Sequence, residues 1–459
     1  MSKVLLLSPP TPWDSYVVQS ELYPNLSIIL LGTILKEAGH DAKVIHMLAD
    51  KVTMPKLKEL ILDYQPDIVG ITMVTFQAKT SREVMRLVKE AKKSIKVIIG
   101  GPHPSALGNS SLATFPNADI AVIGEGDLAI LDIINDDIEQ GILYPKPVTD
   151  LDALPIPDLS LINIKKFSGI YPPGPMPSFN IIGSRGCPFK CTFCSRSAMS
   201  NKLRLRSPQN IIKEIITLHQ QWKIREFFFQ DDTFNVNRKW VNELLNLIIS
   251  NGLNKKIAYR ARCRVNEKLV DSELLSLMKE AGFWEIFYGV ESGNQAMLDS
   301  MNKEITIYEI ERAFKLTREA GIKTEASFII GMPGETSKTI LQSLDLWRKI
   351  DPDWCSFSRA IPFPGTDLER ELRKKGHLIV DNSEDFVLEK TLVRTDKMSA
   401  ELLEACAVEI GKLITTDKFM RMVKNPNELA RTARDMMKSR RSMKKGMEKV
   451  LQIVFGRNQ

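Results

Sequence analysis

The feature that most constrains this fold is an alternation of short apolar runs with longer amphipathic segments, repeated in two series along 459 residues. Apolar runs of roughly four to eight residues, bounded by turn residues, are typical of buried parallel strands. The segments between them have the length of crossover helices. Each series therefore predicts an α/β unit built on a parallel sheet.

The first series occupies residues 1–145 and predicts a doubly wound parallel sheet. Strands are expected at 3–8, 42–47, 67–72, 96–101 and 119–124, with helices at 26–39, 54–65 and 78–93 and another beginning near Glu125. Ligands of such sheets bind outside the carboxyl ends of the strands. The segments at those ends (8–13, 72–77, 100–105 and 124–127) are therefore the expected binding edge.

The second series occupies residues 179–370, after a proline-rich linker or strap at 146–178. Strands are expected at 180–186, 226–232, 257–263, 285–291, 324–331 and 354–361, and helices at 208–222, 238–251, 271–281, 306–320 and 336–349. Six parallel strands are too few for an eight-fold barrel. They predict a partial (β/α)6 barrel that is open at one side.

Residues 371–459 are expected to form a helical region of different character. Their last part mixes Met, Leu and Val with many Lys and Arg. Basic amphipathic helices can lie on anionic membranes. Peripheral membrane contact and a solvated helical cap on the barrel both stay open, and the cap is the favoured interpretation.

The composition is that of an ordinary globular protein, with 43% hydrophobic and 26% charged residues. The longest apolar runs are too short for a membrane-spanning helix, and the first residues predict a strand in place of a signal peptide. A cytoplasmic location with reduced thiols is expected. The net charge of +7 is modest and lies largely in the last part of the chain, and no nucleic-acid partner is expected.

Half of the six cysteines lie in one short segment, GSRGCPFKCTFC, at 183–194. Cys187, Cys191 and Cys194 are separated by three and two residues. In a reducing compartment a cluster of this kind indicates a metal or catalytic site, and thiolates suit zinc or iron–sulfur clusters.

A closed zinc site would need a fourth ligand. Cys263, Cys355 and Cys406 are far apart along the chain, and His103 belongs to the other series. Three thiolates on a four-iron cluster would leave one iron open to a substrate or cofactor.

The spacing CPFKCTFC, directly after the first strand of a six-stranded α/β series, resembles the radical S-adenosylmethionine (SAM) enzymes. The resemblance implies that Cys187, Cys191 and Cys194 hold a [4Fe–4S] cluster whose fourth iron binds SAM. An electron from the cluster would then cleave SAM to a 5′-deoxyadenosyl radical. The resemblance also places seven residues at SAM, from QDDTF, GVESG, FIIGMPGET and neighbouring segments: Phe193, Asp231, Asp232, Arg262, Glu291, Ser292 and Gly331. Arg262 would face the barrel mouth if Tyr259, Ala261 and Cys263 point away.

The first series resembles the cobalamin-binding domain that precedes many radical SAM cores, in the segments 24–46, 66–72, 98–105 and 119–127. The corrin would lie across the strand ends. The residues expected to contact cobalamin are Pro10, Thr75, Gln77, Gly100, Gly101, His103, Ser105, Gly124 and Glu125.

The chain departs from one known pattern, because the Asp-x-His-x-x-Gly motif that supplies an axial histidine to cobalt is missing. This puts histidine ligation in doubt more than cobalamin binding itself. His103, preceded by GGP, is interpreted as a hydrogen-bonding or packing residue rather than as a cobalt ligand.

The resemblance implies a cobalamin-dependent methyltransferase that acts on an unactivated carbon of an organic, apolar or lipid-like small molecule. A flavodoxin or ferredoxin would supply the electron. The alternative is a ring-forming oxidoreductase of the anaerobic magnesium-protoporphyrin ester cyclase type, with a tetrapyrrole substrate. A cobalamin or iron–sulfur sensor without turnover is the non-enzyme alternative. A tRNA methylthiotransferase is disfavoured, because residues 1–186 contain no cysteine.

Overall fold

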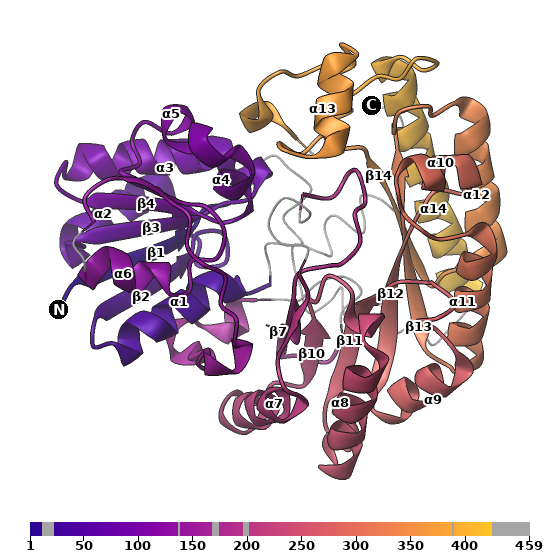
Figure 1. Ribbon diagram of the computed structural model, residues 1–459, viewed down its shortest axis with the longest axis horizontal. Helices are drawn as coiled ribbons and strands as arrows, with labels where there is room; N and C mark the ends of the chain where they lie inside the picture. Colours follow the sequence, from indigo (N-terminus) through magenta and orange to yellow (C-terminus); the bar gives the residue numbers. More distant parts are fainter. Residues whose placement is uncertain (12–22, 136–137, 168–173, 196–201, 388–389, 425–459) are drawn as a thin grey trace.

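The computed structural model describes residues 1–11, 23–135, 138–167, 174–195, 202–387 and 390–424 (Figure 1). Two six-stranded parallel sheets dominate it. The N-terminal sheet, in indigo and purple, lies beside the open side of a barrel-like sheet coloured magenta to orange. The α/β fold class predicted from the sequence is confirmed.

The N-terminal sheet has the strand order β2-β1-β3-β4-β5-β6, and all of its pairings are parallel. Its strands are β1 (Lys3–Ser8), β2 (Asp41–His46), β3 (Ile68–Thr72), β4 (Lys96–Gly100), β5 (Ile120–Val122) and β6 (Gly141–Leu143). The five expected strands are present, whereas β6 was missed. β6 is a half-buried edge strand of three residues, too short to leave an apolar run in the sequence.

Helices cover both faces of this sheet, as a doubly wound fold requires. They are α1 (Leu26–Glu37), α2 (Met54–Tyr64), α3 (Ala78–Ala91), α4 (Pro102–Leu107), α5 (Ser111–Thr114) and α6 (Ala129–Asn135). Alternate residues of β1 enter different cores: Val4 and Leu6 pack with α1, and Leu5 and Leu7 pack on the α2 and α3 side. Both faces of β1 are therefore buried, which explains its unbroken apolar run.

The strap that follows runs along the surface of the N-terminal unit. It contains three short 3-10 turns among its described residues, at Leu151–Ala153, Leu159–Leu161 and Ile164–Lys166. The side chain of Thr33 in α1 accepts a hydrogen bond from the backbone of Asp158 at 2.9 Å. This contact holds the strap against the helix that borders the carboxyl ends of the strands.

The second sheet has the order β14-β13-β12-β11-β10-β7, again parallel throughout, and forms a partial barrel as predicted. Its strands are β7 (Ser178–Ile181), β10 (Glu226–Phe229), β11 (Ala258–Cys263), β12 (Phe283–Glu291), β13 (Lys323–Ile330) and β14 (Trp354–Arg359). The helices between them are α7 (Pro208–Trp222), α8 (Arg238–Ser250), α9 (Ser272–Glu280), α10 (Gln295–Ser300), α11 (Ile307–Glu319) and α12 (Ser337–Ile350).

The first expected barrel strand, 180–186, is divided in two. β7 ends at Ile181, and the chain leaves the sheet to form a small antiparallel hairpin of β8 (Ser184–Arg185) with β9 (Arg204–Leu205). The buried carboxylate of Asp231 causes this turn, because it accepts hydrogen bonds from the Gly183 backbone and the Ser184 hydroxyl.

The region after the barrel is helical only in part. α13 (Asp367–Lys374) and α14 (Ala400–Lys424) flank a stretch whose described residues contain one 3-10 turn, Ser383–Asp385. Most of the basic stretch for which membrane contact was left open, residues 425–459, lies outside the described residues. Within the described ranges, no helix has the length and hydrophobicity needed to cross a bilayer.

Candidate active site

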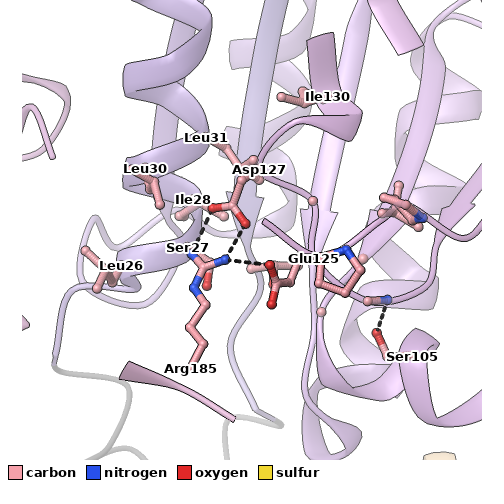
Figure 2. Close-up of a pocket in the computed structure, with 18 of the residues that line it drawn as sticks. Leu26, Ser27, Ile28, Leu30, Leu31, Ser105, Glu125, Asp127, Ile130 and Arg185 are labelled. Carbon is pink, nitrogen blue, oxygen red and sulfur yellow. Dashed lines mark hydrogen bonds and ion pairs between the residues drawn. The ribbon is translucent and has the colours of Figure 1, made fainter. Parts of the chain in front are cut away.

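A cavity of about 780 Å³ lies between the carboxyl edge of the N-terminal sheet and the barrel (Figure 2). The ends of β3, β4 and β5, the first half of α1, the strap and the β8–β9 hairpin all contribute to its wall. The wall is mainly apolar at α1, where Leu26, Ile28 and Leu31 line it. The expected binding edge thus borders a cavity large enough for a sizeable ligand.

Five of the residues predicted at cobalamin line this cavity: Gly100, Gly101, Ser105, Gly124 and Glu125. Gly101 and Gly124 have φ angles of 96° and 104°, in the left-handed region that favours glycine. The hydroxyl of Ser105 accepts a hydrogen bond from the Gly124 backbone at 2.9 Å, which joins the loops after β4 and β5. A glycine-lined rim of this kind lets a flat ligand approach the backbone closely.

The other four predicted residues, Pro10, Thr75, Gln77 and His103, lie outside the cavity lining. The Gln77 amide donates to the Pro9 carbonyl at 2.7 Å. The His103 side chain is fully buried, with Nδ1 3.2 Å from the Thr75 hydroxyl and its ring against Phe115. Burial lowers the pKa of His103 to about 4, although the charge of Glu384 opposes this shift. These contacts support the interpretation of His103 as a packing residue.

The cysteine segment is attached to the barrel by its backbone. Thr192 donates its N–H to the Met301 carbonyl at 2.9 Å and accepts from the Leu368 N–H at 3.0 Å. The side chain of Asn302 donates to the Lys190 carbonyl at 2.9 Å. The segment is therefore held by the loop after α10 and by the start of α13, both far away in sequence.

Side chains of the barrel also contact the thiols. Arg264, just beyond β11, donates from Nη1 to Cys191 Sγ at 3.7 Å and stacks over the Phe189 ring at 3.6 Å. The Cys187 thiol lies 3.7 Å from the Thr233 hydroxyl. The cysteine segment is thus also in contact with the barrel through its side chains.

Glu291 ends β12 in an unusual backbone conformation, with φ of 67°. The register with β13 shifts between Gly289 and Glu291, so the strand bulges at this point. Lys303 donates to the Glu291 carboxylate at 2.6 Å, and its ammonium lies 5.8 Å from the centre of the Phe193 ring. A Cβ at Gly289 would clash with Glu291 Oε1, so the first glycine of GVESG makes room for this pair.

The remaining residues predicted at SAM have different settings. Arg262 lies between the rings of Phe228 and Phe287, on the barrel-lumen side of β11. Tyr259, Ala261 and Cys263 are buried in the core on the helix side, as their alternation predicted. Ser292 is buried beside Ser343, and the Gly331 N–H donates to Glu335 at 3.3 Å.

The two aspartates of QDDTF differ sharply. Asp232 lines the cavity, whereas Asp231 is buried beneath the hairpin. Burial raises the pKa of Asp231 to about 6, and the hydrogen bonds from Ser184 and Gly183 partly oppose that rise. The geometry of Asp231 is that of a residue that supports the hairpin, and the SAM contacts of all seven residues stay predictions.

The donor set fits an iron–sulfur cluster with an open iron better than a closed metal site. Within the described ranges, no three His, Cys, Asp or Glu side chains converge as a mononuclear metal site requires. Burial raises the pKa of the thiols of Cys263 and Cys355; Cys263 belongs to the apolar core, and Cys355 is partly buried against it. Cys187, Cys191 and Cys194 stay the three predicted ligands of the cluster.

Sequence reasoning missed the polar partners that hold these residues in place, among them Lys303, Arg264 and Arg185. The alternation of Arg260, Arg262 and Arg264 is a signal that could have placed Arg264 with Arg262 on one face of the strand. No local signal marks Lys303, which reaches Glu291 only through the turn after α10.

Two family models match the chain. The radical SAM superfamily matches residues 181–346, and the B12 binding domain matches residues 18–134.

Relatives at about 30% identity match most of this chain. An uncharacterized methyltransferase of Pyrococcus horikoshii is 31% identical over 80% of this chain and 82% of its own length. An anaerobic magnesium-protoporphyrin IX monomethyl ester cyclase of Cereibacter sphaeroides is 30% identical over 80% of this chain and 63% of its own length.

Solved structures share the fold at low identity. The cobalamin-dependent SAM radical enzyme OxsB, with aqua-cobalamin and SAM bound, superposes with a TM-score of 0.72 at 17% identity, over 95% of this chain and 71% of that one. The radical SAM methyltransferase TsrM of Kitasatospora setae, with cobalamin and a [4Fe–4S] cluster bound, gives 0.66 at 18% identity, over 88% and 84%.

Proposed function

The chain belongs to the radical SAM enzymes that carry a B12-binding domain, and from this premise we propose that it transfers a methyl group to a carbon atom of a small organic molecule. Its cofactors are SAM, a [4Fe–4S] cluster and cobalamin. Together these groups supply the radical and methyl-transfer chemistry that acid–base side chains cannot perform on an unactivated carbon.

One observation carries the proposal. The cavity at the carboxyl edge of the N-terminal sheet shares a wall with the cysteine segment, because Arg185 and Gly186 line the cavity and directly precede Cys187. A cobalamin in this cavity and a cluster on Cys187, Cys191 and Cys194 would therefore be neighbours. Such proximity is what an enzyme needs if it uses both groups on one substrate.

The residues have separate tasks under this proposal. The three cysteines would hold the cluster, and Arg264 would stabilise the charge on the Cys191 sulfur. Glu291, held by Lys303, would bind the hydroxyl groups of SAM at the end of β12. Gly100, Gly101, Ser105 and Gly124 would border cobalamin.

The substrate would occupy the barrel mouth between the two units. Phe228 and Phe287 flank Arg262 on the lumen side. This aromatic surface suits a planar or apolar molecule. A reductant such as flavodoxin or ferredoxin would deliver the electron.

A cyclase is the second candidate, because the relative in Cereibacter sphaeroides that spans 80% of this chain is named for ring formation on a magnesium porphyrin. The two functions share cofactors and differ in what happens to the substrate. Relatives named as methyltransferases, including those of Streptomyces wedmorensis and Chlorobaculum tepidum, favour methyl transfer.

The test is anaerobic reconstitution with iron, sulfide and hydroxocobalamin, followed by quantification of iron and cobalamin per chain after gel filtration. One cluster and one cobalamin per chain are expected. Incubation with methyl-labelled SAM and a reductant should then transfer label to cobalamin without any substrate. A protein that binds the cluster but no cobalamin, or that never moves the label, would contradict methyl transfer.

A further inference from the structure

Four charged side chains from the two units meet in the wall of the cavity, and three of them, Arg185, Glu125 and Asp127, are labelled in Figure 2. Arg185 of the hairpin donates to Asp127 from Nη1 at 2.6 Å and from Nη2 at 3.0 Å, and its Nη1 lies 3.1 Å from Glu125 Oε2. Arg204, across the hairpin, donates to both oxygens of Glu125. Two cations thus face two anions, and we call these four residues the rim clamp.

The rim clamp is shielded from water. The exposed fractions of its side chains are 8% for Arg204, 10% for Asp127, 16% for Glu125 and 18% for Arg185. Charges at this depth are stable only when they are paired and hydrogen-bonded. Burial alone would raise the pKa of Glu125, but hydrogen bonds from Arg204 and the Val148 backbone and the charge of Arg185 hold it below its usual range.

The two arginines of the rim clamp lie on the hairpin from which the cysteine-bearing segment starts. Arg185 and Arg204 are register partners in the β8–β9 pair, so two like charges lie opposite each other. Such pairs repel unless anions lie between them. Residues 186–195, the cysteine loop, contain Cys187, Cys191 and Cys194 and follow β8 directly, so the hairpin is the stem of this loop. The anions that stabilise this stem therefore also determine where the cysteine loop begins.

The anions come from the other unit. Glu125 and Asp127 belong to the GEGD turn after β5, and the glycines of that turn, Gly124 and Gly126, line the cavity. Both oxygens of Glu125 are engaged by Arg204, with Val148 and Arg185 adding to one of them. Glu125 was predicted as a cobalamin contact, but its carboxylate is directed at the hairpin.

We propose that the rim clamp is a positioning element that couples occupancy of the cobalamin cavity to the placement of the cysteine loop; this rests on the proposed function. A ligand against Gly124 and Gly126 fixes the GEGD turn. The two parallel hydrogen bonds between Arg185 and Asp127 restrict both the distance and the relative orientation of the GEGD turn and the hairpin. Fixing the turn therefore also fixes the hairpin. The loop that bears the cluster is thereby set relative to cobalamin.

Coupling between two sites is reciprocal, so it can be measured from either side. The experiment determines the dissociation constant of hydroxocobalamin for the full chain before and after anaerobic reconstitution of the cluster. In the wild type the cluster should tighten hydroxocobalamin binding at least about fivefold, the lower end of typical coupling. The measured quantity is the ratio of the dissociation constant without the cluster to that with the cluster. In Asp127→Asn this ratio should fall to about one, because the neutral amide breaks the two-point pair.

Arg185→Lys is the second variant, since it keeps the charge but cannot make two parallel hydrogen bonds, and its ratio should lie between those two values. It carries the test if Asp127→Asn fails to fold. Glu384→Gln is the matched control. It weakens another inter-unit pair, with Arg82 Nε at 2.7 Å, on a contact remote in sequence from the hairpin. Its ratio should equal that of the wild type.

The outcomes separate the two ideas. Variants that weaken binding equally with and without the cluster, so that the ratio is unchanged, would overturn the rim clamp and leave the proposed function standing. A wild type in which the cluster leaves the dissociation constant of hydroxocobalamin unchanged would also overturn the rim clamp and leave the proposed function standing. A wild type that binds no hydroxocobalamin in either state would overturn the proposed function and the rim clamp with it.

Discussion

Lys303 donates a hydrogen bond to Glu291 at 2.6 Å, and this buried pair joins the end of β12 to the ring of Phe193 in the cysteine segment. The exposed fractions of the two side chains are only 10% and 8%. The pair therefore connects a residue predicted to bind SAM with a residue next to the last predicted cluster ligand.

Substituting Glu291→Gln should weaken SAM binding and lower stability together. The amide leaves the Lys303 ammonium buried without its counter-charge, which should reduce the free energy of unfolding by about 2 kcal/mol. SAM affinity, measured by calorimetry on the reconstituted protein, should fall about tenfold or more, equivalent to about 1.4 kcal/mol. Glu273→Gln is the control, because that side chain is 86% exposed. Unchanged SAM affinity in Glu291→Gln would refute the role assigned to this carboxylate.

The cysteines should separate into two classes on mutation. Cys191→Ala should lose bound iron and the ability to form 5′-deoxyadenosine after reduction, because a cluster with two thiolates is poorly held. Cys263→Ala should keep both, since its thiol lies in the apolar core and packs against the helices. It should instead lose about 1–2 kcal/mol of stability through the cavity that it leaves. Iron analysis and product detection on both variants provide the measurement. Retention of the cluster in Cys191→Ala would contradict the assignment.

His103 should make the protein less stable as the pH falls. Its pKa is about 4 in the folded state and 6.5 for an ordinary histidine, so the unfolded chain binds the proton first. Stability should therefore fall as the pH drops from 6.5 to 4, by about 3 kcal/mol from this group. Urea unfolding of His103→Gln across this window should lack that contribution. Thr75→Val, which removes the hydroxyl partner but keeps the imidazole, should retain it.

Asp231 should make the protein less stable as the pH rises, opposite to the effect of His103. Its pKa is raised from 3.8 to about 6 in the folded protein, so the folded state binds the proton more tightly than the unfolded chain. Its contribution is complete below pH 3.8 and is lost as the pH rises towards 6, by about 3 kcal/mol. Asp231→Asn should abolish this slope in urea unfolding. Ser184→Ala removes a hydrogen bond that lowers the pKa, so it should extend the window to higher pH. A slope that persists in Asp231→Asn would assign it to another group.

The elements of this fold could be predicted wherever burial leaves a local pattern. β1 and α7 occupy the residues expected from the sequence, 3–8 and 208–222, because both strand faces or a full helical stripe enter the core. β6 escaped prediction because an edge strand of three residues needs no apolar run. The break in 180–186 escaped because its cause, Asp231, lies beyond α7 and β10 in the chain.

The sequence by itself determined the three-cysteine segment, since its ligands are neighbours along the chain and their spacing survives in any fold. It also determined two parallel α/β units, because buried strands must be apolar. Only the tertiary structure decided which polar groups meet: Arg185 with Asp127, Arg204 with Glu125, and Lys303 with Glu291. The residues that flank a charged side chain in the sequence do not identify its partner. Its pairing follows from where crossovers and hairpins bring distant segments together, and from the cost of leaving a buried charge alone.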